Sequence, residues 1–528
     1  MLLPSGVTSG FLRARSILTL DPALSGDSIW WHEGVVREVG WSAQLGRKVP
    51  TPVPRFDLPR TIVTPGFVDG HTHFASWGAN RRRVRLAGTA TRAEALERIA
   101  RGTPKGGWVL GQGWLSHGWD AEPDRWSLDA VVTGPAWFES GDLHAGWANS
   151  AALAAAGIDR QTPDPEGGRI VRDGNGEPSG VLLERAMELM LPHLPVPTTD
   201  ELVAGIRESQ TLAHEVGITG IHDVEGPEAL AAFRQLELAG ELKLRVLFHP
   251  PVAQLPTLIA NGVRSGQGTP WLALGGVKLF LDGSLGSRTA WMLQPYEDGR
   301  DRGMPLGSEA EARRAIQDAA YAGISCVIHA IGDAAVRRAL DLLDDAPRVR
   351  LPHRIEHFQC VHAYDLDRAA RNHIVASMQP VHLPGDVAAA EERWGARSSG
   401  AYPLRSLIDN GTILAFGSDT PVAPLDPRQG IVAAMGRVAR DGSFPGGWYP
   451  EQRIGFEEAV RGFTIGNALA AGRAERAGRL APGYEADLVA WSLEDAGALP
   501  HDPQAFGAAR VALTVVGGEV VYAGGERH

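Results

Sequence analysis

Cysteine is nearly absent from this sequence, and no long hydrophobic run is present. Only two cysteines, Cys326 and Cys360, occur among 528 residues, and neither belongs to a CxxC motif. So few thiols exclude a disulfide-stapled fold and indicate a reducing compartment. The first residues lack the basic start and apolar stretch of a signal peptide. No uncharged apolar run reaches the roughly 18 residues of a membrane span, so the sequence predicts a cytoplasmic protein without a membrane partner.

An excess of positive charge is also missing. The 51 basic and 62 acidic side chains give a formal net charge of −11, which argues against a nucleic-acid partner. With 44% hydrophobic and 21% charged residues, the composition is typical of a globular protein with a large core. We therefore expect a small-molecule ligand, and a homodimer is the general expectation for the assembly.

Short β-rich pieces separated by turns occupy both ends of the chain. They cover residues 11–62, and DLVAWSL and ALTVVGGEVVYAGG continue the pattern near the other end. Because edge strands need partners, this arrangement predicts that the two ends pair with each other. We expect one small β-sandwich-like domain from residues 1–62 and 475–528.

Strands and helices alternate in the remaining chain, residues 63–474. Apolar strands such as ISCVIHA and TILAFGSD alternate with helical segments such as EAEARRAIQDAAYAG and FEEAVRGFTIGNALAAG, and polar residues stand at the C-terminal ends of the strands. This α/β pattern predicts a (β/α)₈ TIM barrel with its site at the C-terminal mouth. A doubly wound open sheet is the competing architecture, but no GxGxxG motif follows a strand.

Residues 76–200 depart from this alternation and predict an insertion, with a hairpin, over the barrel mouth. The region holds six of the 15 tryptophans: Trp108, Trp114, Trp119, Trp126, Trp137 and Trp147. Tryptophan most often fills a core. Lining of a substrate pocket by two or more of them is the equally weighted alternative.

The first chemical motif is PGFVDGHTH, residues 65–73. Side chains alternate along a strand, so His71 and His73 point to the same side and can hold one ion. An isolated HxH pair is common by chance, but this one ends a strand.

The second motif is GGVKLFLDGSLGSRTA, in which Lys278 interrupts an apolar strand. A lysine in such a strand must extend to solvent, pair with an acid or be modified. Reaction with CO₂ would give an anionic carbamate that can bridge two metal ions. From spacing alone, an ion-paired strand lysine is the better interpretation.

Three further strands end in groups that can bind metal. SCVIHAIGD places His329, HRIEHFQ places His357 beside Glu356, and ILAFGSDTP places Asp419. An aspartate at such a position can bind a metal ion and also accept a proton from water. Each histidine alone is more often structural, but five strand ends together predict a metal centre.

These motifs resemble those of the amidohydrolase superfamily, in the branch that includes N-substituted formamide deformylases. PGFVDGHTH, HAIGD, RIEH and GSDTP resemble its metal-site segments, GVKLFLDGSLGSRTA its lysine strand, and GDLHAGWANSAAL a segment of its insertion. LAPGYEADLVAW resembles the return to the small β domain. The resemblance covers essentially the whole chain.

The resemblance implies one or two divalent ions per chain, with zinc as the first candidate and iron and manganese as alternatives. His71 and His73 would bind the buried ion, and a carboxylated Lys278 would bridge to a second ion held by His329 and His357. Asp419 would bind the first ion and act as the general base. If Lys278 is unmodified, a mononuclear site with His71, His73, His329 and Asp419 is expected.

Four residues are weaker candidates for contacts with the substrate: His144, Arg288, His382 and Trp114. His144 could donate a hydrogen bond to a substrate carbonyl, whereas Arg288 and His382 could equally fix loops. His222 is a candidate for the layer behind the metal ligands. His214 lies on an amphipathic helix and is expected to be structural.

We therefore expect a hydrolase of carbon–nitrogen bonds other than peptide bonds, acting through a metal-activated water. A mononuclear deaminase and an ester or carbamate hydrolase use the same fold and remain alternatives. From a different class, the chain could be a non-catalytic amidohydrolase-like protein. Retention of all six candidate ligands argues against the last alternative.

Overall fold

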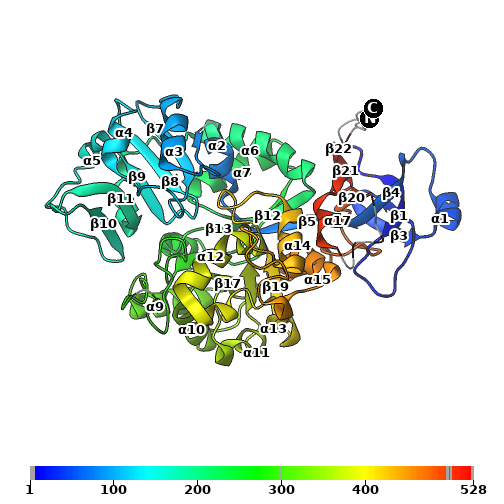
Figure 1. Cartoon of the computed structure of the whole chain (residues 1–528). Coiled ribbons are helices and arrows are strands. Elements are labelled where there is room, and N and C mark those ends of the chain that lie inside the picture. The colour runs from blue at the N-terminus through cyan, green and yellow to red at the C-terminus, as the bar shows by residue number, and fades with distance from the viewer. Residues whose placement is uncertain are drawn as a thin grey trace.

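The computed structural model describes residues 6–81, 83–297, 299–494, 497, 499 and 502–524. Figure 1 shows three groups of strands: those from the two ends of the chain lie on one side, an inserted sheet lies on the opposite side, and the parallel strands lie between them. The candidate site belongs to the middle group of strands.

A single mixed sheet contains strands from both ends of the chain. Its spatial order is β22 (Glu519–Ala523), β21 (Arg510–Val516), β20 (Leu488–Ser492), β4 (Arg55–Pro65), β1 (Gly10–Ile17), β2 (Ser28–His32) and β3 (Val35–Gly40). The ends meet where β20 runs antiparallel to β4. The indole nitrogen of buried Trp31 donates to the carbonyl of Gly518 at 2.9 Å, which joins the two ends a second time. The sandwich-like form and the proposed domain boundaries stay predictions.

Nine parallel strands form two sheets in the middle of the chain. One contains β14 (Leu272–Leu274), β13 (Arg245–His249), β12 (Ile218–Val224) and β5 (Phe67–Thr72). The other contains β15 (Gly276–Phe280), β16 (Ser325–Ala330), β17 (Arg354–His357), β18 (Val375–Met378) and β19 (Ile413–Phe416). The predicted mixed α/β class with parallel strands is therefore confirmed.

The two parallel sheets meet along two edges. A single parallel bridge joins Thr72, at the end of β5, to Thr420, beyond β19. At the other edge a bridge joins Pro251, beyond β13, to Lys278 on β15. A continuous closed barrel is not detected among the described residues, since these contacts are isolated bridges rather than ladders.

Helices connect the parallel strands and cover them. They are α6 (Thr199–Glu215), α7 (Pro227–Leu238), α8 (Leu255–Ala260), α9 (Glu309–Tyr321), α10 (Asp333–Asp344), α11 (Arg368–Arg371), α12 (Leu383–Trp394), α13 (Leu404–Asp409), α14 (Pro427–Gly436), α15 (Phe456–Arg461) and α16 (Asn467–Ala470). Capping boxes begin two of them, at Thr198 before α6 and at Ser308 before α9. Each box satisfies backbone N–H groups that the first turn leaves unpaired.

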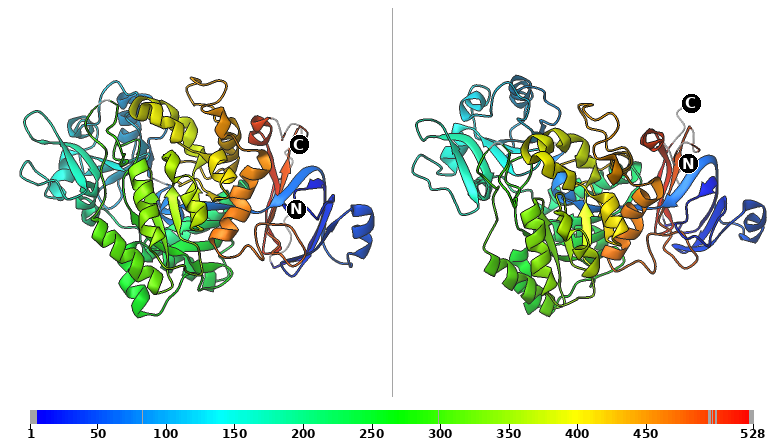
Figure 2. Two further views of the ribbon diagram at one scale, coloured as in Figure 1. Left: turned by 90° about the horizontal axis from the view of Figure 1, so that it is seen from below. Right: turned by 60° about the horizontal axis from the view of Figure 1, so that its bottom comes forward.

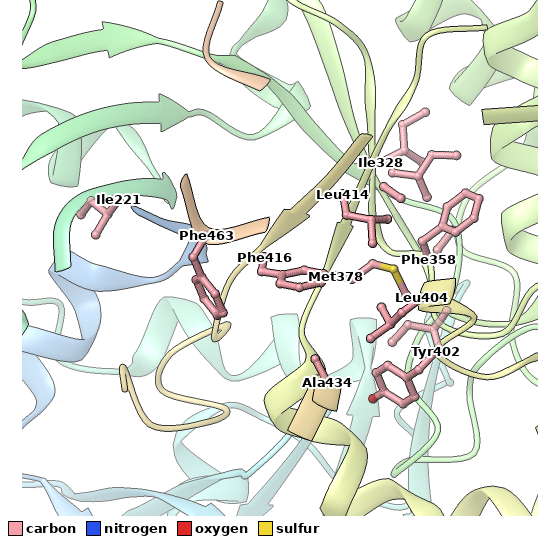
Figure 3. Packing of buried hydrophobic residues seen from close by; sticks show 14 of the residues in the cluster. Ile221, Ile328, Phe358, Met378, Tyr402, Leu404, Leu414, Phe416, Ala434 and Phe463 are labelled. Carbon is pink, nitrogen blue, oxygen red and sulfur yellow. The ribbon is translucent and has the colours of Figure 1, made fainter. Parts of the chain in front are cut away.

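The apolar faces of these helices and the outward faces of the strands form the main core. Figure 3 shows part of it, where Phe416 of β19 lies between Phe463 and Met378 of β18. The rings of Phe416 and Phe463 are 5.6 Å apart and nearly perpendicular, an arrangement that the charge distribution of aromatic rings favours. This packing fixes the strands whose ends carry the candidate ligands.

The pattern of FEEAVRGFTIGNALAAG predicts one helical segment, but the structure does not form one uninterrupted α-helix there. A π-helical stretch, Gly462–Gly466, separates α15 from α16. Both of its glycines are tightly packed: a Cβ on Gly462 would lie 2.4 Å from the Phe416 ring, and one on Gly466 would lie 1.8 Å from the Leu414 carbonyl oxygen. Close approach to β19 therefore accounts for the glycines that flank the break.

The inserted region forms a six-stranded sheet of its own. Its order is β10 (Gly168–Arg172), β11 (Pro178–Glu184), β9 (Ala145–Ala148), β8 (Ala136–Ser140), β7 (Val109–Trp114) and β6 (Val84–Arg85). It is accompanied by α3 (Arg92–Ala100), α4 (Arg125–Asp129) and α5 (Ser150–Ala155), whereas α2 (Phe74–Asn80) packs against α6. β10 and β11 form the predicted hairpin. Both views of Figure 2 show this sheet projecting from the parallel strands on the side away from the terminal strands.

Most tryptophans of the insertion belong to its own core. Trp108, Trp114, Trp137 and Trp147 are buried within its two hydrophobic clusters. Gly146 allows this packing, because a Cβ there would lie 1.8 Å from the Trp137 ring. These four indoles therefore stabilise the insertion.

Two short helices accompany the terminal strands: α1 (Ser42–Lys48) and α17 (Pro503–Gly507). Within the described part of the chain, none of the helices combines the length and the apolar character that crossing a membrane requires.

Candidate metal centre

Strand β5 delivers two imidazoles to the end of the parallel strands. The Nδ1 of His71 is hydrogen-bonded to the carboxylate of Glu356, and the Nδ1–H of His73 donates to the carbonyl of Val224 at 2.8 Å. These bonds fix the orientation of both rings and leave each Nε2 available. Burial, together with Lys278, lowers the pKa of His71, which favours the neutral form that binds metal.

Asp419 lies against both of these nitrogens. Its Oδ1 is 3.5 Å from Nε2 of His71 and 3.3 Å from Nε2 of His73. Burial alone would raise the pKa of Asp419, but the surrounding histidines, His71 first, hold it well below its ordinary value. Burial opposes protonation of His73, but Asp419 raises the pKa of His73 above its ordinary value. A carboxylate with two imidazoles is a suitable donor set for a divalent cation, which would take the place of the proton on His73.

His329 and His357 complete the group of imidazoles. Their ring centroids are 4.4 Å apart, and the His357 ring lies 5.3 Å from that of His71. His329 donates from Nε2 to the carbonyl of Gly283 at 3.0 Å, so its Nδ1 is the nitrogen left for a ligand. In both rings burial holds the pKa well below its ordinary value.

Among the described residues, His71, His357 and Asp419 form a group of possible metal ligands. One donor atom from each lies within 4.8 Å of the others. Two of these residues have strained backbones, with φ angles of 68° for His357 and 60° for Asp419. A residue other than glycine pays an energetic cost in this left-handed region, and such strain persists where the surrounding structure fixes a functional side chain.

Lys278 points into the same group from β15. The residue is only 3% exposed, and it forms no ion pair among the residues that the structure describes. Its ammonium nitrogen lies 4.8 Å from the centre of the Phe280 ring. Burial lowers its pKa to about 8, although Glu356 and Asp419 oppose this shift. The amine is thus neither exposed nor paired with an acid.

A buried arginine supports the centre from behind. Arg354 donates to Glu356, the carboxylate that orients His71, and to the Gly70 carbonyl at 2.6 Å. It is also 2.8 Å from Nδ1 of His222. Burial would raise the pKa of Glu356, but Arg354 and His71 hold it well below its ordinary value. His222 therefore lies in the layer behind the ligands, as its strand-end position indicates.

Among the candidates for substrate contacts, His144 is the one that the structure brings next to the metal ligands. Its ring lies 5.4 Å from that of His329, and its Nδ1 is 2.9 Å from Oε2 of Glu184. Burial opposes protonation, yet Glu184 and Asp142 raise the pKa of His144 to about 9. His144 is therefore a cationic donor beside the centre.

The other three candidates have different surroundings. His382 donates from Nε2 to the carbonyl of Ser418 at 2.9 Å, directly before Asp419. The guanidinium of Arg288 lies 5.7 Å from the ring centre of Tyr296. Trp114 is buried and donates to the Phe138 carbonyl at 2.7 Å. The structure thus places Trp114 in the core of the inserted sheet and not beside the candidate ligands.

Two acidic residues of the insertion, Asp142 and Glu184, bond to the loop that follows β15 and so join the insertion to the centre. Asp142 accepts hydrogen bonds from Ser284 at 2.8 Å and from Ser287 at 3.0 Å, both in the loop after β15. Glu184 accepts a hydrogen bond from Thr289 in the same loop. These contacts fix His144, which lies two residues beyond Asp142, and they were not apparent from the sequence.

A cavity of about 480 Å³ lies next to His73. It is bordered by the end of β12 at Val224 and Glu225, by β7 and β8 of the insertion, and by the segment 191–197. The cavity therefore gives a small molecule access to one side of the candidate centre.

The fold is that of the metal-dependent hydrolases. The chain belongs to the amidohydrolase family, whose model matches residues 56–522. The putative amidohydrolase YtcJ of Bacillus subtilis is 30% identical over 526 residues, which are 94% of this chain and 96% of the relative. The N-substituted formamide deformylase of Arthrobacter pascens is 28% identical, covering 82% of this chain and 84% of the relative.

Solved structures agree with the family assignment. An uncharacterized metal-dependent hydrolase from Pyrococcus horikoshii superimposes with a TM-score of 0.77 at 27% identity, covering 95% of this chain and 99% of that one. The superfamily resemblance drawn from the sequence motifs is confirmed.

Proposed function

We propose that this protein hydrolyses a carbon–nitrogen bond of a non-peptide amide with a metal-activated water. The observation that carries the proposal is the group His71, His357 and Asp419, whose donor atoms lie within 4.8 Å of one another at the ends of parallel strands. Similarity to N-substituted formamide deformylase supports the choice of an amide bond.

The residues present fit a divalent cation. Imidazole nitrogens and a carboxylate are ligands that zinc accepts, although iron and manganese accept them too. Hydrogen bonds to Glu356, Val224 and Gly283 engage one nitrogen of His71, His73 and His329, which is the usual support for metal-binding histidines. A bound ion would lower the pKa of water and polarise the scissile carbonyl.

Asp419 and His144 would then handle protons and the substrate. Asp419 is ionised and buried, so its carboxylate can take a proton from the attacking water and return it to the departing nitrogen. His144, held by Glu184, can donate a hydrogen bond to the carbonyl oxygen as negative charge develops there.

The test of this function is a screen of the metal-loaded protein over N-formyl, N-acyl, cyclic amide and carbamate substrates. Asp419→Asn should keep its fold by circular dichroism and lower kcat by at least about 100-fold, because general-base catalysis contributes that much. Near-normal turnover in this variant would remove Asp419 as the base.

The same screen separates the alternatives. Ammonia release from an amino-substituted heterocycle would indicate a deaminase, and faster cleavage of esters or carbamates would indicate that bond class. A metal-loaded protein that turns over none of these substrates would favour a non-catalytic role.

We further propose that Lys278 is carboxylated and bridges two ions. A buried lysine without an acidic partner must find another way to reduce the cost of its charge, and a carbamate would supply an anionic ligand between His71 and the His329–His357 pair. Protein reconstituted with zinc and bicarbonate should bind about two ions per chain by elemental analysis, and Lys278→Met about one. One ion in both proteins would contradict the binuclear site.

We also propose that the two parallel sheets close into the (β/α)₈ barrel. The bridges Thr72–Thr420 and Pro251–Lys278 support this, because they join the sheets on both sides. In that arrangement the candidate ligands would share the C-terminal mouth, where barrel enzymes carry their chemistry.

A further inference from the structure

The cavity beside His73 has one strongly apolar wall. The short 3₁₀ helix Leu191–His193 and the residues between it and α6 supply this wall: Leu191, Leu194, Pro195, Val196 and Pro197. Two of these residues are unusually open for their type, since Leu191 is 50% exposed and Val196 is 70% exposed. Exposed apolar side chains gathered at a cavity favour contact with an apolar part of a ligand.

The opposite side of the cavity carries a carboxylate with one unused oxygen. Oε1 of Glu225 accepts a hydrogen bond from the backbone N–H of Ser76 at 2.8 Å. Oε2 is buried and has no hydrogen-bond partner among the described residues. A buried acceptor without a partner is costly, so this oxygen is suited to receive a donor from a ligand.

No other charged group among the described residues forms a hydrogen bond with this oxygen. Glu139 also lines the cavity, but the positive charge of Arg83 acts on it and opposes the effect of its burial. Burial raises the pKa of Glu225, and the charge of the neighbouring His73 opposes this shift. A cationic group of a ligand beside Glu225 would favour its ionised form. The cavity is therefore apolar along one side and carries, on the other, a carboxyl group with an unpartnered oxygen.

We propose, on the basis of the hydrolase function proposed above, that the cavity selects amides whose non-reacting end is a short apolar chain carrying a protonated amine. The chain would lie against Leu191, Leu194 and Val196, and the ammonium group would donate to Oε2 of Glu225. The scissile bond would then lie on the side of His73.

Two probes of equal length test this assignment. N-formylcadaverine and N-formylhexylamine differ only in an ammonium group that replaces the terminal methyl group. Wild-type protein should show a kcat/KM about tenfold or more higher for the amine-bearing probe, because a charge-assisted hydrogen bond discriminates by at least that factor. Acetyl and carbamoyl versions of both probes extend the test to other reacting groups.

Glu225→Gln should bring the ratio of the two kcat/KM values close to one. Glu215→Gln is the matched control, because Glu215 is exposed at the end of α6 and is not one of the residues that line the cavity. The wild-type ratio should persist in this variant. A merely structural role for Glu225 would lower both kcat/KM values together and leave their ratio unchanged, which would overturn the assignment.

Val196→Lys provides a second test that does not depend on the buried carboxylate. This exposed position tolerates substitution, and a positive charge at the cavity should lower the ratio by about two- to threefold. Turnover of both probes at equal rates by the wild-type protein would contradict the substrate class. Absence of turnover for all probes, with the metal bound, would instead contradict the proposed hydrolase function.

Discussion

At the scale of single residues, the centre depends on how each imidazole is held. Glu356 binds Nδ1 of His71 and is itself bound by Arg354 and by the Ser377 hydroxyl at 2.8 Å. Since a carboxylate behind a histidine fixes the ring and strengthens its other nitrogen as a donor, Glu356 should govern metal affinity although it is not a candidate ligand.

Glu356→Gln is expected to weaken zinc binding by about 10- to 100-fold. The amide can still accept a hydrogen bond from His71, so the ring stays in place but loses its anionic partner. Competition with a chromophoric chelator measures the affinity. Glu391→Gln is a suitable control, because Glu391 contacts Trp448 and Ser398 and has no contact with the candidate ligands. Unchanged affinity in folded Glu356→Gln would disprove this role.

The sequence identifies the candidate ligands better than their supports. Alternation along β5 predicts that His71 and His73 share a face, and the structure brings both against Asp419. Along β17, however, alternation places Glu356 and His357 on opposite faces. Both reach the centre because His357 has a φ of 68°, and a left-handed residue at a strand end leaves no pattern in the sequence.

At the scale of elements, hydrophobic periodicity locates the strands and helices that surround the site. SCVIHA is β16 in full, and the predicted helix EAEARRAIQDAAYAG contains α9 (Glu309–Tyr321). The π-helical break at Gly462–Gly466 depends on contacts with β19. Such contacts between distant segments override local propensity, so the break could not be predicted.

Helix α6 contains a buried histidine that should make the protein sensitive to acid. His214 donates from Nδ1 to the Ile218 carbonyl at 3.1 Å, and its own carbonyl accepts from Thr514 of β21 at 2.8 Å. Burial lowers the pKa of His214 from 6.5 to about 4. The unfolded chain therefore binds a proton below pH 6.5 that the folded protein does not bind until about pH 4.

The stability supplied by neutral His214 is complete above pH 6.5 and is lost as the pH falls toward 4. Between pH 7 and pH 5 the loss should be about 2 kcal/mol. Urea unfolding at both pH values should show that His214→Gln is less sensitive to this change by that amount. His193→Gln, at an exposed position, should respond like the wild type. Equal pH sensitivity of His214→Gln and wild type would contradict the prediction.

At the scale of the whole molecule, the strands from the two chain ends are tied to the parallel strands by partly buried charges. Arg245 of β13 forms a bidentate pair with Asp487, next to β20, with distances of 2.5 and 3.0 Å. Asp487 also accepts from the backbone N–H of Gly517 at 2.7 Å. The sequence predicts that the ends pair with each other, but it has no signal for this contact between residues 242 positions apart.

Asp487→Ala should loosen the terminal strands from the rest of the molecule. The side chains of Arg245 and Asp487 are only 12% and 14% exposed, and Glu485 remains 3.4 Å from Arg245 in this variant. Loss of the bidentate partner should therefore cost about 2 kcal/mol rather than the full penalty of an unpaired buried charge. Hydrogen exchange in β20, β21 and β22 should accelerate by up to about 30-fold, with less change in β16 and β17.

The matched control is Asp57→Ala, which breaks the Arg13–Asp57 pair within the terminal sheet. Its side chains are 48% and 65% exposed, and exposed pairs contribute about 0 to 1 kcal/mol, so exchange should remain close to that of the wild type. If Asp487→Ala leaves exchange in the terminal strands unchanged, apolar packing of Trp491 against Phe67, rather than this ion pair, joins the two parts. If exchange accelerates equally in all strands, the molecule unfolds as one cooperative unit and the pair stabilises the whole chain.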